Sequence, residues 1–131
     1  MSNTATILTI PVDAVRARLG NGDLWTKGWG TPADPTAPTC LHGAIRYCQS
    51  TPGDAYLIEQ VGSRFGFGVG DNDRAADFMV VDRLLVEHAE ITDEMLAVTF
   101  GPQWEPIVAL VRRTAVLTVD EAGKLDAAGE A

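Results

Sequence analysis

Residues 39–61 read T-C-L-H-G-A-I-R-Y-C-Q-S-T-P-G-D-A-Y-L-I-E-Q-V and decide the fold. After Thr39, which is placed to cap a helix, four side chains recur at the spacing i, i+3, i+4, i+7 of an amphipathic helix: Leu41, Ala44, Ile45 and Cys48. Residues 51–54, T-P-G-D, start a second helix, because threonine caps, proline suits a first turn and an acid favours the positive dipole end. This helix continues to about Arg64. Two such helices in succession predict a mainly α fold.

Four further helices are predicted on either side. Apolar spacing indicates helices at residues 11–19 and 105–115, and an apolar run indicates one at 74–89. The helix at 92–100 is indicated by its cap, by acids in its first turn and by the glycine after its end. The run Asp71-Asn72-Asp73 offers caps for the helix over 74–89, and Thr92 caps the one that follows. The 74–89 helix is apolar around most of its circumference, which is typical of a central helix covered by its neighbours. Its β-branched content leaves a strand over 78–86 as an alternative.

A minimal sheet is predicted from two similar β-branched segments, residues 6–10 and 115–119. The predicted fold is therefore mainly α, a single domain of five or six helices over residues 1–131, with this two-stranded sheet. Residues 1–5 and 123–131 are small and polar and are expected to be flexible.

Residues 20–39 form a long loop rich in glycine and proline, without helical or strand periodicity. A loop of this length is uncommon in a compact domain, and it usually indicates either a functional segment or a missed element of secondary structure. It contains Trp25 and Trp29, and tryptophans must bury either within the molecule or in a partner. The loop is therefore the first candidate for a binding surface.

Composition narrows the function classes. The chain has 46% hydrophobic residues, which argues against disorder, and no stretch approaches the roughly 18 uncharged apolar residues of a membrane-spanning helix. Its 18 acidic against 10 basic residues give a net charge of -8, which disfavours direct contact with nucleic acid or an anionic membrane. Residues 1–9 lack the pattern of a signal peptide, so we expect a cytoplasmic protein. Its partner is expected to be a protein, and its oligomeric state is open.

Three short motifs resemble a small family of unknown function from actinobacteria and their bacteriophages. They are W-T-K-G at 25–28, C-L-H-G-A at 40–44 and N-D at 72–73, matching the family pattern G-W-x-x-G, C-x-x-G-A and N-D. The chain departs from the pattern at Leu24, where the family has glycine, and ahead of Asn72, where the family has tryptophan. The resemblance implies a helical cytosolic protein, plausibly phage-encoded, and implies no reaction. Independently, the small residues Gly43 and Ala44 predict a close approach between their helix and the long loop.

Two chemical readings use the cysteines. Cys40, His42, Cys48 and His88 are zinc-competent residue types, but Cys40 and His42 would point about 200° apart on a helix, so no metal site is predicted. Cys40 at a helix N-terminus is instead a candidate nucleophile, with His42 or His88 as its base. No local signature of a cysteine enzyme accompanies it, so an enzyme is the less favoured reading. No cofactor is predicted.

The favoured reading is therefore a small acidic protein that binds a host protein, with inhibition of a host or defence enzyme as one form of that role. The residues predicted to form the binding surface are Trp25, Lys27, Trp29, Phe65 and Phe67. The alternatives are a cysteine-dependent enzyme that uses Cys40 with a histidine, and a protein that imitates DNA by its acidic surface.

Overall fold

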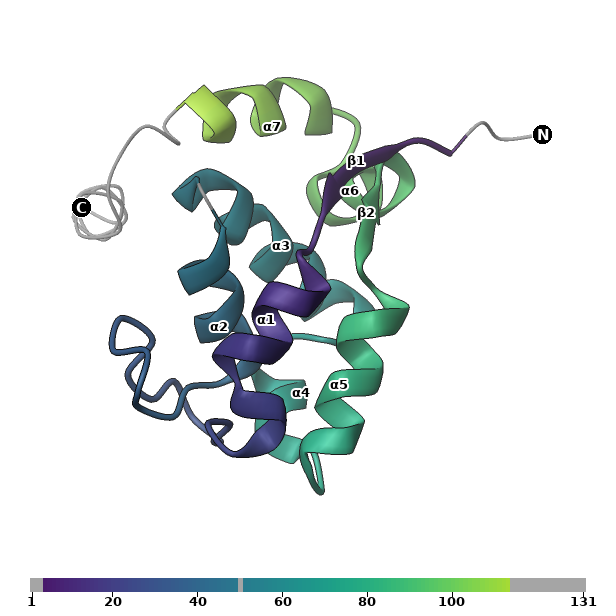
Figure 1. Cartoon of the computed structure of the whole chain (residues 1–131). Helices are drawn as coiled ribbons and strands as arrows, with labels where there is room; N and C mark the ends of the chain where they lie inside the picture. The colour runs from purple at the N-terminus through teal and green to yellow at the C-terminus, as the bar shows by residue number, and fades with distance from the viewer. Residues whose placement is uncertain (1–3, 50, 114–131) are drawn as a thin grey trace.

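The computed structural model describes residues 4–49 and 51–113 and is mainly helical, as the sequence predicts (Figure 1). Within these residues the chain forms seven α-helices, one 3-10 turn and one two-stranded sheet. The elements are β1 (Thr6–Thr9), α1 (Val12–Arg18), the 3-10 turn η1 (Gly20–Gly22), α2 (Leu41–Cys48), α3 (Pro52–Phe65), α4 (Val69–Arg74), α5 (Phe78–Glu87), β2 (Glu90–Thr92), α6 (Asp93–Phe100) and α7 (Trp104–Arg113). The seventh helix, beyond the five or six predicted, is α4.

The core forms around α3, which contacts α2, α4, α6 and α7. The side chains of Leu57, Ile58 and Val61 on α3 are fully buried. They pack with the buried face of α2, which includes Leu41 and Ile45, as the apolar spacing of residues 39–61 predicts. Helix α7 crosses above α3 (Figure 1), and Arg112 Nε donates to Asp54 Oδ1 at 3.0 Å between these two helices.

Strand β1 confirms the predicted strand at 6–10 and pairs antiparallel with β2. Thr6 faces Thr92 and Thr9 faces Glu90, with a bulge between Thr6 and Leu8. The pairing joins the start of the chain to the connection between α5 and α6. Strand β2 is only three residues long, too short to show alternation, and was not predicted. Residues 115–119, the predicted partner of residues 6–10, lie outside the described residues.

Two predicted helix caps are wrong. The N-cap of α2 is Cys40, whose Sγ accepts from the amide of Gly43 at 3.3 Å, whereas Thr39 turns to the loop. Residues 71–73 lie inside α4 and do not cap α5, whose N-cap is Asp77, with Oδ1 accepting from Val80 N at 3.3 Å. The helix predicted over 74–89 therefore starts at Phe78. The break arises because Ala75 is extended, with ψ of 135°.

The structure confirms a helix over residues 78–86, and the alternative of a strand there is wrong. It also confirms the cap predicted for the next helix. Thr92 caps α6, its Oγ1 accepting from Met95 N at 3.3 Å. Within the described part of the chain, no helix has the length and apolar character needed to cross a bilayer.

Candidate functional site

Asn72 on α4 joins three segments that are distant in sequence. Its side chain is buried, and its Oδ1 accepts from the indole Nε1 of Trp25 at 2.8 Å and from the amide of Leu41 at 3.0 Å. Its Nδ2 donates to the carbonyl of Thr26 at 3.2 Å. One amide side chain therefore fixes the long loop against both α4 and the first turn of α2.

Asp73 holds the next part of the loop. Its Oδ1 accepts from the amide of Gly28 at 2.6 Å. Gly28 has φ of 73°, a left-handed conformation that glycine adopts without steric cost. The pair Asn72 and Asp73 thus anchors residues 25–28, so the tryptophan motif and the N-D motif meet in space.

The second half of the loop packs on α2 where Gly43 lies. Thr39 Oγ1 donates to the carbonyl of Trp29 at 2.8 Å, and the amide of Thr26 donates to the carbonyl of Thr39 at 3.1 Å. A Cβ on Gly43 would overlap Thr39 Oγ1 and lie 3.0 Å from Pro32 Cγ. This confirms the close approach of loop and helix that the small residue predicts.

Arg18, at the end of α1, clamps the tip of the loop. Only 5% of this residue is exposed, and its Nη2 donates to the carbonyls of Thr31, Pro32 and Asp34 at 3.1, 3.1 and 2.8 Å. Its guanidinium also lies over the ring of Tyr47, 5.1 Å from the centroid. Sequence reasoning missed this residue, because an arginine in the last turn of a helix is usually a solvated partner of the dipole. The one available signal was its spacing of three from the buried Val15.

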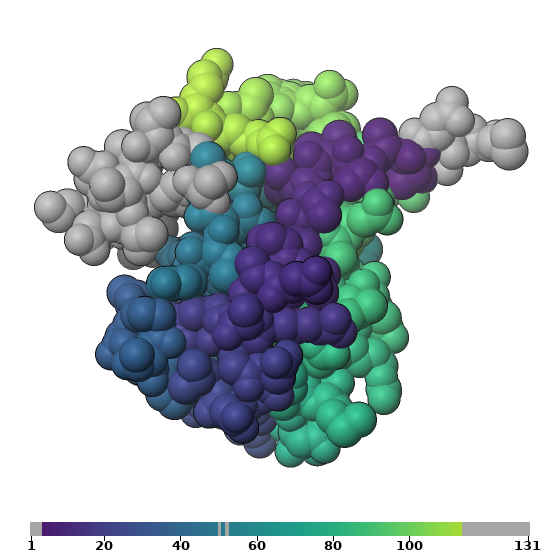
Figure 2. Space-filling view, in the orientation of Figure 1, coloured from purple at the N-terminus to yellow at the C-terminus, as the bar shows by residue number. Residues whose placement is uncertain are grey.

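The residues predicted to form the binding surface divide by exposure. Trp29 is 38% exposed, with the guanidinium of Arg46 5.5 Å from its ring centroid, and Lys27 is exposed. Trp25 and Phe65 are half-buried against the core. Phe67 is 1% exposed, so its ring belongs to the core. In Figure 2 the loop covers the lower left of the face shown.

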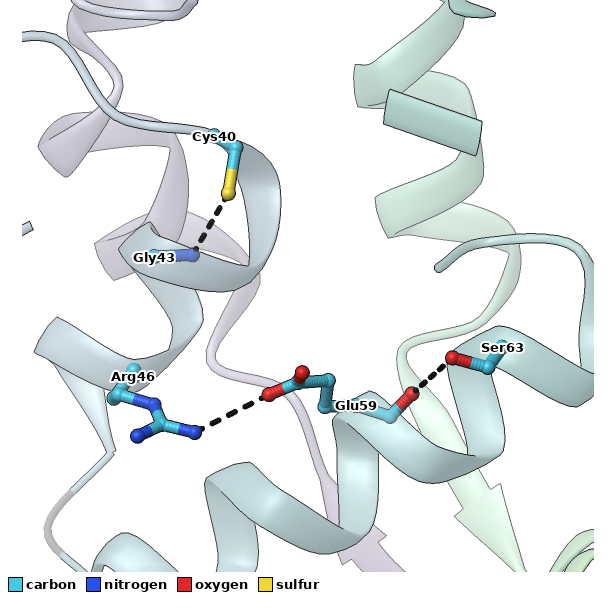
Figure 3. A network of polar contacts seen from close by, with 5 residues as sticks. All are labelled: Cys40, Gly43, Arg46, Glu59 and Ser63. Atoms are coloured by element: carbon cyan, nitrogen blue, oxygen red, sulfur yellow. Dashed lines mark hydrogen bonds and ion pairs between the residues drawn. The ribbon is translucent and has the colours of Figure 1, made fainter. Parts of the chain in front are cut away.

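Tyr47 is an exposed aromatic that sequence reasoning missed. It is 47% exposed and adjoins Arg46 on α2. The ion pair from Arg46 Nη2 to Glu59 Oε2, at 3.2 Å, links α2 to α3 (Figure 3). The same guanidinium lies over the Trp29 ring.

The cysteines do not offer accessible thiolates. Cys40 is fully buried and its Sγ accepts from the amide of Gly43 (Figure 3). Burial raises the pKa of the Cys40 thiol and also that of the half-buried Cys48 thiol. For Cys40, the N-cap position lowers the pKa of an exposed thiol, but here the cost of desolvating the thiolate outweighs that effect. Across residues 4–49 and 51–113, no three histidine, cysteine, aspartate or glutamate side chains gather as a metal site.

Both histidines lie near the ring of Phe67. The His42 ring is 6.2 Å from the Phe67 ring and the His88 ring is 4.5 Å from it, centroid to centroid. His42 is buried, and its Nε2 lies 2.7 Å from the carbonyl oxygen of Phe67. Because that oxygen only accepts, Nε2 carries the proton of the neutral ring. Burial lowers the pKa of both histidines, which makes each ring a weaker base, and no hydrogen bond joins either ring to Cys40 within residues 4–49 and 51–113.

His42 is expected to make the protein less stable as the pH falls below neutrality. Its pKa in the folded state is lowered by burial from the ordinary 6.5. Below pH 6.5 the unfolded chain therefore takes up a proton that the folded chain refuses, and the free energy of unfolding decreases. The variant His42→Gln keeps a donor for the Phe67 carbonyl and removes the titration. Urea unfolding between pH 7.5 and 5.5 should show a shallower decline for this variant, whereas an unchanged slope would contradict the assignment.

Comparisons of the chain with protein-family models, with curated proteins and with solved structures found no match. The resemblance carried by the three motifs therefore assigns no family. The functional argument consequently depends on the chain's own geometry.

Proposed function

We propose that this chain is a binding protein that captures another protein through the surface formed by Lys27, Trp29 and Tyr47, here named the Trp29 surface. One observation carries the proposal: side chains from α1, α2 and α4 hold the 20–39 loop in place, and Trp29 of that loop is still 38% exposed. A loop fixed before binding loses little conformational entropy on association. Tryptophan and tyrosine supply large contact areas that dominate many interfaces.

Charge supports a protein partner over nucleic acid, because a net charge of -8 repels phosphates. On the strength of the motif resemblance alone, we propose that the protein acts in the cytoplasm of an actinobacterium or of a phage-infected host cell. In that setting the partner is a host protein, and inhibition of a host or defence enzyme is the form of the role that we propose. The thiol of Cys40 is fully buried, so it gives no support for the alternative of a cysteine-dependent enzyme.

Replacing Trp29 by alanine is expected to abolish capture of the partner while leaving the melting temperature within a few degrees. Because the ring is partly exposed, its loss removes contact area from the interface with little effect on the core. The measurement is a pull-down from an actinobacterial lysate with the tagged chain, accompanied by thermal unfolding. Leu110→Ala, which truncates a 56% exposed side chain on α7, is the matched control and should capture normally. Capture that survives Trp29→Ala, or a variant that unfolds, would remove the proposed surface.

A further inference from the structure

Helix α5 carries a second apolar surface that is independent of the Trp29 surface. Its inner face is buried through Val81 and Leu85. On its outer face, Met79 is 72% exposed, Val86 is 49% exposed and Val80 is 36% exposed. The sequence predicts a helix covered by its neighbours all round, but α5 lies at the side of the molecule, flanked by α1 and η1 (Figures 1 and 2).

A hollow adjoins this apolar face, lined by Asn21, Phe78, Met79, Asp82 and Arg83. Phe78 in this lining is partly buried, and its ring centroid lies 6.3 Å from that of Trp25. It also packs closely on the turn at Gly22, where a Cβ would lie 3.1 Å from the Phe78 ring. This side chain is therefore held by its neighbours. Met79 in the same lining is flexible and adapts to apolar groups of different shapes.

The charges around this face are mainly negative. Asp77, the N-cap of α5, and Glu87, its last residue, are exposed carboxylates, as are Asp13 on α1 and Asp23 after η1, the two elements that contact α5. Asp82 is occupied by Arg16, whose Nε and Nη2 donate to its two oxygens at 2.7 and 2.9 Å. Arg83 is the remaining cation here, and no ion pair joins it to a carboxylate within the described residues. An apolar strip with an acidic rim is complementary to a segment that is apolar on one side and basic on the other.

We propose that the outer face of α5, with its hollow, is a docking site for a cationic amphipathic helix of a partner protein. An apolar side chain of that helix enters the hollow beside Met79, and its lysines or arginines face Asp13, Asp23 and Glu87. A second copy of this chain is the less suitable occupant, because two molecules of charge -8 repel each other.

The test uses the full chain and two synthetic helical peptides of the same length, one of leucine and lysine and one of leucine and glutamate. Binding is followed by calorimetry and by amide chemical shifts. We expect the lysine peptide to bind, with shifts centred on α5 and η1 and with affinity that falls as salt is raised. The glutamate peptide should not bind.

The double variant Met79→Ser, Val86→Ser should weaken binding of the lysine peptide by about tenfold or more, because it removes two apolar contacts. The matched control is the double variant Val98→Ser, Leu110→Ser, since those side chains are 54% and 56% exposed on α6 and α7. It should bind within about twofold of the parent chain. Failure of the lysine peptide to bind, equal losses in the two variants, or shifts spread over the whole surface would each overturn the proposal.

Discussion

Replacing Asn72 by alanine is expected to destabilise the protein by about 3 kcal/mol, because it leaves several polar groups without a hydrogen-bond partner at once. The indole of Trp25 and the amide of Leu41 would lose their acceptor, and the carbonyl of Thr26 would lose its donor. The Leu41 amide is buried, so water does not replace the lost bond there. Urea unfolding at pH 7.5 measures the change. For a chain of this size, thermal unfolding should shift down by about 10 °C.

Two further variants separate the role of Asn72 from a general effect of truncation. Trp25→Phe removes one donor and keeps most of the ring, so its coupling to Asn72→Ala in a double-mutant cycle should be about 1 kcal/mol. Asp73→Ala removes the bond from the exposed Gly28 amide and a long bond of 3.4 Å from Asn72 Nδ2, and it should cost about 1 kcal/mol. An Asn72→Ala protein as stable as its parent would show that the three segments are not joined at this residue.

Gly43→Ala is expected to destabilise by about 2–3 kcal/mol, although alanine is the better helix former. The added methyl would overlap Oγ1 of Thr39, a fully buried residue, and would press on Pro32 at 3.0 Å. Thr39 would have to move, and with it the bond from its hydroxyl to the Trp29 carbonyl. The variant should therefore disturb the loop as well as the helix. Chemical unfolding gives the stability, and the amide shifts of residues 25–31 report the loop.

Gly70→Ala is the matched control for this substitution. Gly70 lies in α4, is exposed and has a negative φ, and a Cβ there meets only the flexible end of Arg74 at 3.2 Å. This variant should be neutral within about 0.5 kcal/mol. Adding Thr39→Ala to Gly43→Ala removes the overlapping hydroxyl and should recover part of the lost stability. Equal behaviour of the two glycine variants would contradict the packing role of Gly43.

Periodicity in the sequence was sufficient to predict most helices. The apolar faces of α2, α3 and α7 follow the 3.6-residue repeat, and each helix is long enough for the repeat to be seen. Helix α6 is instead predicted from its cap, from the acids of its first turn and from the glycine after its end. Helix α4 has only six residues, of which Val69 is the one large apolar side chain, so it offers no period. Its polar residues resemble caps for the next helix, so the sequence predicts that α5 starts at residue 74 instead of at Phe78.

The candidate site was predictable only in part, because its key residues act through contacts that are distant in sequence. Trp29 is predicted to be part of the binding surface because it lies in the long glycine-rich loop, and its partial exposure agrees with a surface role. Phe67 lies between two glycines, as Trp29 does, but it is buried near His42 and His88. Local sequence does not distinguish the two cases. Arg18 holds carbonyls 13 to 16 residues away, and no motif encodes such a clamp.

Amide hydrogen exchange in the unbound protein, followed by NMR, tests most directly whether the loop is fixed before it meets a partner. The amides of Thr26, Gly28 and Thr31 donate to Thr39 O, Asp73 Oδ1 and Pro38 O at 3.1, 2.6 and 3.0 Å. If these bonds persist, the three amides should exchange at least about a hundredfold more slowly than in an unstructured peptide. In Asn72→Ala, under conditions where the chain stays folded, this protection should fall while that of Ile45 in α2 is kept. Exchange of the three amides at unstructured rates in the parent protein would contradict the account.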